Sequence, residues 1–265
     1  MDRRQYLRTA GAFNVALTFA GCSGGDGSDG GDNESQPTRG TTASTSVQIS
    51  ATPQLLLDDQ IPPSYENGGV RRQSENPLVG DTAWVFDGEG YILSDYVWGE
   101  RDHSGTLSAW VNIPTVAAAP DDDKGILSTH DDGQTGNTRF AQLSLTQFRN
   151  GEGVGIYKGK VRADATRAIV TDHPLGEWFH ITGVVDKSRN ELRVYFNGSQ
   201  EDTTTDIDIS MEQRGAFGLG TRAKRRGNEY IFDKRFTGML DDVRVYETVL
   251  TDDQIAALAQ SNPPR

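Results

Sequence analysis

The stretch Trp178-Phe-His-Ile-Thr-Gly-Val-Val-Asp-Lys-Ser-Arg-Asn-Glu-Leu-Arg-Val-Tyr-Phe-Asn-Gly198 decides the fold class. It contains two apolar runs rich in β-branched and aromatic residues, and the polar turn Asp186–Asn190 separates them. In the second run, Glu191–Phe196, apolar and polar residues alternate, which is the period of a strand with one buried face. Asn197-Gly198 is then a favoured two-residue hairpin turn. The stretch therefore predicts consecutive antiparallel strands.

Similar short apolar runs, separated by Gly, Asp and Asn, extend in both directions from this stretch. The predicted strands are Thr82–Phe86, Tyr91–Leu93, Gly105–Ile113, Gly125–Thr129, Phe140–Phe148, Gly153–Tyr157, Ala168–Thr171, Trp178–Asp186, Glu191–Phe196, Gly215–Gly220 and Phe236–Tyr246. One helix is expected after Thr251, because Thr251 and Gln254 have capping-box spacing and an apolar stripe follows them. We predict an all-β fold, a two-sheet antiparallel jelly-roll sandwich with one short C-terminal helix.

The N-terminus carries two motifs of an exported lipoprotein. Arg3-Arg4 lies in a run that resembles a twin-arginine export signal, and Phe19-Ala-Gly-Cys22 resembles a lipobox. The resemblance implies cleavage before Cys22, a lipid on that cysteine, and a protein exported and anchored to the outer face of the cell membrane. Cys22 is the only cysteine of the chain, so it has no internal disulfide partner.

Composition divides the chain into three segments. Residues 1–21 are the expected signal peptide, and residues 22–46 are the expected disordered tether, since they are nearly all small or polar. Residues 47–265 form the expected jelly-roll domain. Asn33 in the tether and Asn197 in the domain each begin an Asn-x-Ser sequon, so both are candidate glycosylation sites.

Charge limits the partners of this protein. The formal net charge is -12, because 38 acidic residues outnumber 26 basic ones. Such an acidic chain is not expected to bind nucleic acid. Acidic excess with scarce lysine resembles proteins of salt-loving archaea, in which molar salt screens the repulsion between carboxylates.

Several motifs in order resemble one family. They are Trp84-Val-Phe-Asp-Gly-Glu-Gly-Tyr91, Gly105-Thr-Leu-Ser-Ala-Trp-Val-Asn112, Gly176-Glu-Trp-Phe-His-Ile-Thr-Gly-Val-Val-Asp186, Leu192-Arg-Val-Tyr-Phe-Asn-Gly198, Phe236-Thr-Gly-Met-Leu-Asp-Asp-Val-Arg-Val-Tyr246 and Leu250-Thr-Asp-Asp-Gln-Ile255. Together they resemble a laminin G-like domain of the concanavalin A-like superfamily, over roughly residues 80–260. The resemblance implies a jelly roll that binds carbohydrate or a cell-surface protein, often on a concave face.

Some relatives of this fold are glycoside hydrolases that carry Glu-x-Asp-x-x-Glu or Glu-x-Asp-x-Glu, and neither pattern occurs here. The four histidines lack metal-ligand spacing, and His180 is expected to be a packed strand residue. We therefore predict a non-catalytic, lipid-anchored binding module. A glycan hydrolase or lyase with an unusual site and a purely structural envelope protein are the alternatives.

Two candidate ligand-binding features stand out. Trp98, in an expected loop, could stack on a sugar ring or fill the core. A dense basic cluster in this acidic chain could bind an acidic polysaccharide or a partner's acidic surface, or could be a solvated loop paired with nearby acids. Its members are Arg222, Lys224, Arg225 and Arg226.

A structural calcium ion is the one cofactor we expect. In Phe236–Tyr246, Asp241 has the same parity as Val243 and Val245, so it is predicted to point inward, where a lone carboxylate needs compensation. In related jelly rolls the matching aspartate binds calcium, and the resemblance makes Asp87 and Gly88 the candidates for the rest of the site. The alternative is that Asp241 only accepts hydrogen bonds from loop amides.

Overall fold

The computed structural model describes residues 47, 49–74, 77–98, 104–131, 141–159, 166–205 and 215–261. The chain divides into two units, residues 1–50 and residues 51–265, and nearly all described residues belong to the second. Cys22, Asn33 and the expected signal peptide and tether lie outside the described residues.

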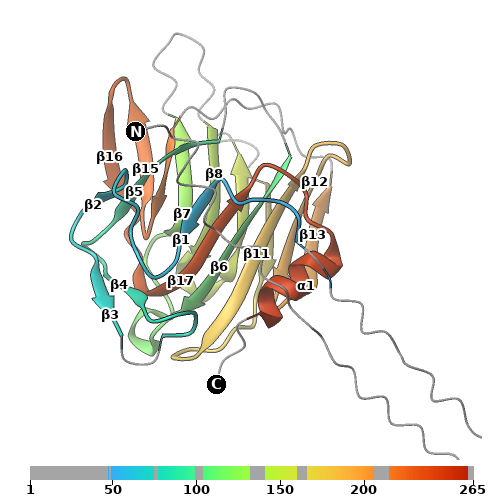
Figure 1. Cartoon of the computed structure of the whole chain (residues 1–265), viewed down its shortest axis with the longest axis horizontal. Coiled ribbons are helices and arrows are strands. Elements are labelled where there is room, and N and C mark those ends of the chain that lie inside the picture. The colour runs from blue at the N-terminus through green and yellow to red at the C-terminus, as the bar shows by residue number, and fades with distance from the viewer. Residues whose placement is uncertain are drawn as a thin grey trace, which may run out of the picture. The chain divides into compact units, whose positions relative to one another are not determined.

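Residues 51–265 form a two-layer sandwich of antiparallel sheets (Figure 1), which confirms the predicted fold class. Sheet A has the order β13-β12-β11-β6-β17-β4-β3, with β1 also paired to β17. Its strands are β1 (Leu55–Leu57), β3 (Arg71–Gln73), β4 (Ala83–Asp87), β6 (Gly105–Asn112), β11 (Trp178–Asp186), β12 (Glu191–Phe196), β13 (Ser199–Thr205) and β17 (Thr237–Tyr246).

Sheet B has the order β10-β9-β8-β7-β14-β5-β2, and the hairpin β15–β16 joins it beside β7. Its strands are β2 (Glu66–Asn67), β5 (Ile92–Val97), β7 (Lys124–Asp131), β8 (Ala141–Phe148), β9 (Gly153–Gly159), β10 (Thr166–Val170), β14 (Ala216–Leu219), β15 (Arg222–Arg226) and β16 (Glu229–Asp233). The pairing of β15 with β7 is parallel, whereas the other pairings within the described residues are antiparallel. Two short 3₁₀ turns, Thr115–Ala117 and Arg149–Gly151, flank β7 and β8.

The core lies between the sheets and follows the strand alternation. In β12, Leu192 and Val194 belong to the apolar core, as predicted, while Arg193 and Tyr195 lie on the outer face. In β8, Leu143 and Leu145 face the same core from sheet B. Each sheet therefore has one core face and one outer face, and any binding surface on a sheet must use the outer one.

A single helix, α1 (Asp252–Gln260), is the only α-helix among the described residues, and it lies over the outer face of sheet A. Thr251 caps it through the predicted capping box with Gln254, which confirms that motif. The helix is joined to the sheet by the Tyr195 hydroxyl, which donates to Oδ1 of Asp252 over 2.7 Å. Within the described ranges, no helix is long and apolar enough to cross a membrane.

Several strands missed by sequence reasoning are short or polar. β1 is apolar but only three residues long, β13 reads Ser-Gln-Glu-Asp-Thr-Thr-Thr at the edge of sheet A, and β15 is the basic cluster, for which a solvated loop was the alternative considered. Edge strands need no apolar side chain on their exposed face, so the alternation signal is lost there.

Candidate functional site

The register of sheet A creates an open surface on its outer face. In β17, Met239 lies opposite Val85 of β4 on one side and opposite Asn112 of β6 on the other. Directly opposed residues share a face, so these three side chains form one row across three strands. The neighbours Leu240 and Val111 belong to the core, which places the row on the outer face.

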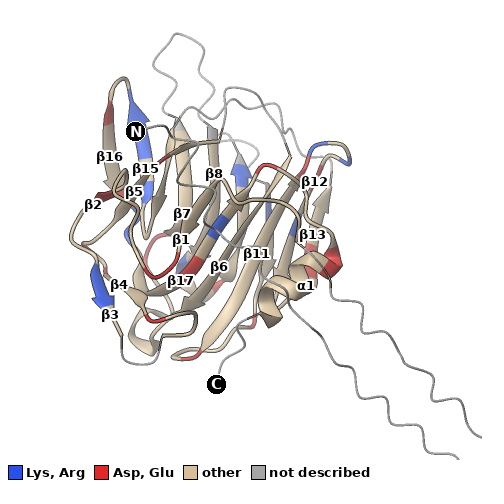
Figure 2. Cartoon of the chain, in the orientation of Figure 1, with Lys and Arg blue, Asp and Glu red and all other residues tan. Residues whose placement is uncertain are grey.

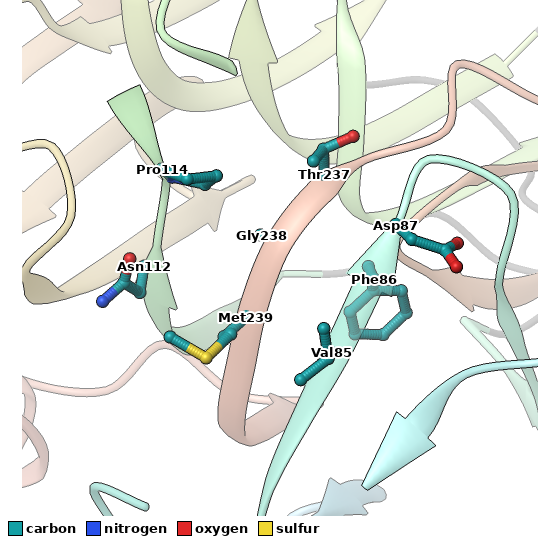
Figure 3. A pocket seen from close by; sticks show the side chains of 8 residues that line it. All are labelled: Val85, Phe86, Asp87, Asn112, Pro114, Thr237, Gly238 and Met239. Atoms are coloured by element: carbon teal, nitrogen blue, oxygen red, sulfur yellow. The ribbon is translucent and has the colours of Figure 1, made fainter. Parts of the chain in front are cut away.

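A second row lies two residues further along each strand. Thr237 is opposite Asp87, and Pro114 follows Asn112 by two positions. Figure 3 shows the two rows side by side, with Asn112, Met239 and Val85 in one and Pro114, Thr237 and Asp87 in the other. They enclose a shallow hollow of about 340 Å³. We call this surface the cross-strand shelf, formed by Val85, Asp87, Asn112, Pro114, Thr237 and Met239.

The floor of the shelf is apolar, and its polar groups lie at the edges. Val85, Met239 and Pro114 supply aliphatic surface. The Thr237 hydroxyl and Oδ1 of Asn112 have no hydrogen-bond partner among the described residues, whereas Nδ2 of Asn112 donates to the carbonyl of Gly176 over 3.2 Å. Such a surface suits a ligand that combines apolar faces with hydroxyl groups.

Asp87 is held in place by its own turn. Its Oδ1 accepts the backbone N–H groups of Glu89 and Gly90, each over 3.1 Å, and its Oδ2 pairs with Arg71 over 3.3 Å. The N–H of Glu89, followed by that of Gly90, holds the pKa of Asp87 below its usual range. The carboxylate therefore stays charged and fixed at the rim of the shelf.

The three predicted calcium ligands are not brought together. Asp87 lies opposite Thr237, and Asp241 lies four residues further along β17, which is about 13 Å at the usual strand rise. The carboxylate of Asp87 already accepts the N–H of Glu89 and pairs with Arg71. Gly88 follows Asp87 directly in sequence, so it lies at the same distant end of β4. The set of Asp241, Asp87 and Gly88 therefore does not form one site, while calcium itself stays a prediction.

Asp241 has a different role from the predicted one. A register shift between Asp241 and Arg244 breaks the alternation of β17, so that Leu240 and Val243 take the core positions and Asp241 lies beside Trp110 on the outer face. The prediction that it points into the core is wrong for this reason, although it is fully buried.

Its oxygens accept backbone N–H groups, the alternative considered from the sequence. Oδ2 accepts from Leu78 over 3.1 Å and from Val79 over 2.9 Å, and Oδ1 accepts from Asp242 over 2.8 Å. Burial, opposed in part by these hydrogen bonds, raises the pKa of Asp241 to about 7.

Trp98 is a core residue, so its predicted stacking on a sugar is wrong for this structure. Its side chain is fully buried and lies edge-to-face against Phe217, with ring centroids 6.0 Å apart. The tryptophan that sequence reasoning missed is Trp178, which is half-buried on the outer face of sheet A. Alternation in its strand would have found it, because Phe179 and Ile181 are the core residues there.

The predicted basic cluster lies in strand β15, which is mostly blue in Figure 2. Arg222 is not available to a ligand, because its Nε and Nη2 both donate to the carboxylate of Asp233, at 2.6 and 2.5 Å. Lys224, Arg225 and Arg226 also have partners in the structure. Paired side chains were the alternative foreseen for this cluster, and none of these residues borders the cross-strand shelf.

Two further predicted residues lie near α1. Asn197 is exposed at the β12–β13 turn, and its Oδ1 accepts the N–H of His180 over 2.8 Å. His180 is buried as expected, against Trp110 at a centroid distance of 5.2 Å. Burial, and secondarily the charge of Arg244, lowers the pKa of His180 to about 3, so its imidazole is neutral.

The two antiparallel sheets, their strand order and an outer-face hollow define a jelly-roll sandwich of the lectin type. The chain belongs to the Laminin_G_3 family, described as the concanavalin A-like lectin/glucanases superfamily, whose model matches residues 86–256. This confirms the family resemblance found in the sequence motifs.

Solved structures of other proteins share the fold. Domain 4 of AbnA, an extracellular arabinanase from Geobacillus stearothermophilus determined with arabinotriose, is 22% identical with a TM-score of 0.54, covering 73% of this chain and 82% of that one. The receptor-binding domain of botulinum neurotoxin mosaic serotype C/D is 11% identical with a TM-score of 0.53, covering 83% and 48%.

Proposed function

We propose that this protein is a non-catalytic, lectin-like module that binds carbohydrate through the cross-strand shelf. The single observation that carries the proposal is the composition of the shelf, an aliphatic floor bordered by a hydroxyl, an amide oxygen and a fixed carboxylate. Sugar rings present apolar C–H faces and hydroxyl edges, which match such a floor and rim. The family of the chain and the arabinotriose complex of the similar AbnA domain are consistent with this ligand class.

Glycan binding in molar salt tests the proposal, with a matched pair of variants. Val85→Lys places a charged side chain on the floor of the shelf and should abolish binding. Val116→Lys makes the same change at a side chain that is 93% exposed and outside the shelf, so it should bind like the wild type. Circular dichroism confirms that both variants fold. Equal binding by both variants would contradict the shelf as the site, and turnover of a bound glycan would contradict a purely binding role.

We also propose that the module is exported and held on the outer face of the cell membrane by a lipid on Cys22. The support is the order of Arg3-Arg4, an uncharged stretch and Cys22 in the sequence. Cys22→Ser should move the protein from the membrane fraction to the medium or leave an unprocessed precursor. Wild-type fractionation of that variant would contradict the anchor.

A further inference from the structure

The first row of the shelf continues into the strands on both sides. Arg71 of β3 lies opposite Val85, and Trp178 of β11 lies opposite Asn112. One row on the outer face therefore crosses five neighbouring strands, in the order Arg71, Val85, Met239, Asn112 and Trp178. Four spacings of about 4.8 Å give the row a length of about 19 Å, which exceeds a single sugar ring.

The row is hollowed beyond the shelf and open at the β3 end. A second hollow, of about 410 Å³, lies over β3 and shares Val85 with the first. β3 is the last strand in the order of sheet A. At the other end, the pairing of β12 with β11 ends at Ile181 and Phe196, so no described strand is paired to β11 at Trp178. A chain longer than the row can therefore extend past the end at β3.

The charge of the two rows is balanced. Arg71 and Asp87 are their charged members, and they pair with each other over 3.3 Å. An anionic ligand would have to compete with Asp87 for Arg71, and a cationic one with Arg71 for Asp87. The rows therefore favour a neutral ligand.

Trp178 provides an aromatic group at one end. It is half-buried, and its indole N–H has no hydrogen-bond partner in the described part of the chain. A tryptophan in this state offers a large apolar face together with a free donor, the combination that makes tryptophan common in binding sites.

We infer that the shelf binds a linear, neutral oligosaccharide laid across the strands of sheet A, with Trp178 stacking against one of its rings. The inference rests on the proposed carbohydrate-binding function and specifies its ligand class. Trp178 contacts the sugar ring at one end of the row. Affinity should therefore increase with the length of the oligosaccharide.

Calorimetry on the full chain in molar salt tests the ligand class. The probes are neutral arabino-, xylo- and gluco-oligosaccharides, each as monosaccharide, trisaccharide and hexasaccharide, with oligogalacturonides as the acidic series. We expect a neutral hexasaccharide to bind at least about tenfold more tightly than its monosaccharide, and the acidic series to bind more weakly. Equal affinity at all lengths, or preference for the acidic series, would overturn the inference but leave carbohydrate binding intact. No binding of any probe would contradict the proposed function and the inference with it.

Variants of two aromatic residues test the location. Trp178→Ala should weaken hexasaccharide binding about tenfold, whereas Trp178→Phe, which keeps a ring, should retain most of it. Binding should change the tryptophan fluorescence of the wild type, and that change should be lost or reduced in Trp178→Phe while binding persists. Tyr157→Ala is the control, because Tyr157 is a half-buried aromatic on the outer face of sheet B, paired with Ser144. Loss of binding in Tyr157→Ala with none in Trp178→Ala would place the ligand on the other sheet and overturn the inference.

Discussion

The backbone N–H of Val79 donates to Oδ2 of Asp241 over 2.9 Å, although the two lie 162 positions apart in sequence. Leu78 donates to the same oxygen. This carboxylate therefore ties the loop before β4 to β17 in the centre of sheet A.

Removing the carboxylate should destabilise the fold. Asp241→Ala leaves the N–H groups of Leu78 and Val79 without their acceptor, and each unsatisfied buried donor costs about 1–3 kcal/mol. We expect the free energy of unfolding to fall by about 2–4 kcal/mol in denaturant titrations. The control is Asp122→Ala, which removes a surface pair with Lys234 and should cost no more than about 1 kcal/mol. Equal losses in the two variants would contradict this role for Asp241.

Asp241 also shows where prediction from sequence succeeds and where it ends. The alternation in Phe236–Tyr246 predicts that Asp241 is buried in the core, whereas it is buried on the outer face, because the register shift after Asp241 has no signature in the sequence. The alternation also does not predict the partners of Asp241, because residues 78 and 79 lie in a loop without periodicity. The family motifs predict the fold well because they lie in long strands whose apolar faces build the core.

The shelf is harder to predict because it depends on register between strands distant in sequence. Val85, Met239 and Asn112 are unremarkable in their own segments and meet only through the pairings of β4, β17 and β6. Trp178 lies within a recognised motif, yet its outer position needs the strand parity to be applied residue by residue. Trp98 lies at the end of β5, where alternation is too short to show that it turns into the core.

Chelation tests the expected calcium ion independently of the fold. Because Asp87 is committed to two turn amides and Arg71, we expect a chelator to shift the thermal midpoints of the wild type and Asp87→Asn by the same amount. A smaller shift in Asp87→Asn would restore Asp87 as a ligand. The same comparison with Asp241→Asn asks whether Asp241 binds an ion in addition to its amides.

A side chain at Gly198, in the turn between β12 and β13, should destabilise the fold. This residue has a φ of 86°, and a Cβ there would lie 2.9 Å from the Cα of Ala256 in helix α1. Gly198→Ala combines left-handed strain with a clash against the helix, so we expect a loss of about 1–3 kcal/mol in unfolding free energy. Gly227→Ala is the matched control, because Gly227 has a φ of 64° but a Cβ added there would meet no atom within 4 Å. A loss in Gly198→Ala no larger than the control's would show that the helix contact adds nothing.

Salt should stabilise this acidic protein. With a net charge of -12, the repulsion between carboxylates is screened as the Debye length falls from about 30 Å at 0.01 M to about 3 Å at 1 M salt. We expect the thermal midpoint to rise steadily from tens of millimolar to molar sodium chloride, and an uncharged osmolyte at low salt to reproduce only part of the rise. A midpoint independent of salt would contradict adaptation to high salt.

Acid should weaken the fold through His180. Burial lowers the pKa of its imidazole from 6.5 to about 3, so between these values the unfolded chain binds a proton that the folded chain does not. The contribution of neutral His180 to stability is therefore fully present above about pH 6.5 and is lost as the pH falls toward about 3, by about 1.4 kcal/mol per pH unit within this window. Arg244 adds to the effect, because its charge disfavours a second cation nearby.

The matched variant His180→Gln removes the titrating imidazole. The other titrating groups are the same in wild type and variant, so their contributions cancel in the difference between the two unfolding free energies. We expect the difference in unfolding free energy between wild type and variant to shrink steadily from pH 6.5 to pH 4, measured by denaturant titration at constant molar salt. A difference that stays constant over this range would show that His180 takes up its proton equally in the folded and unfolded chains, which would contradict its lowered pKa.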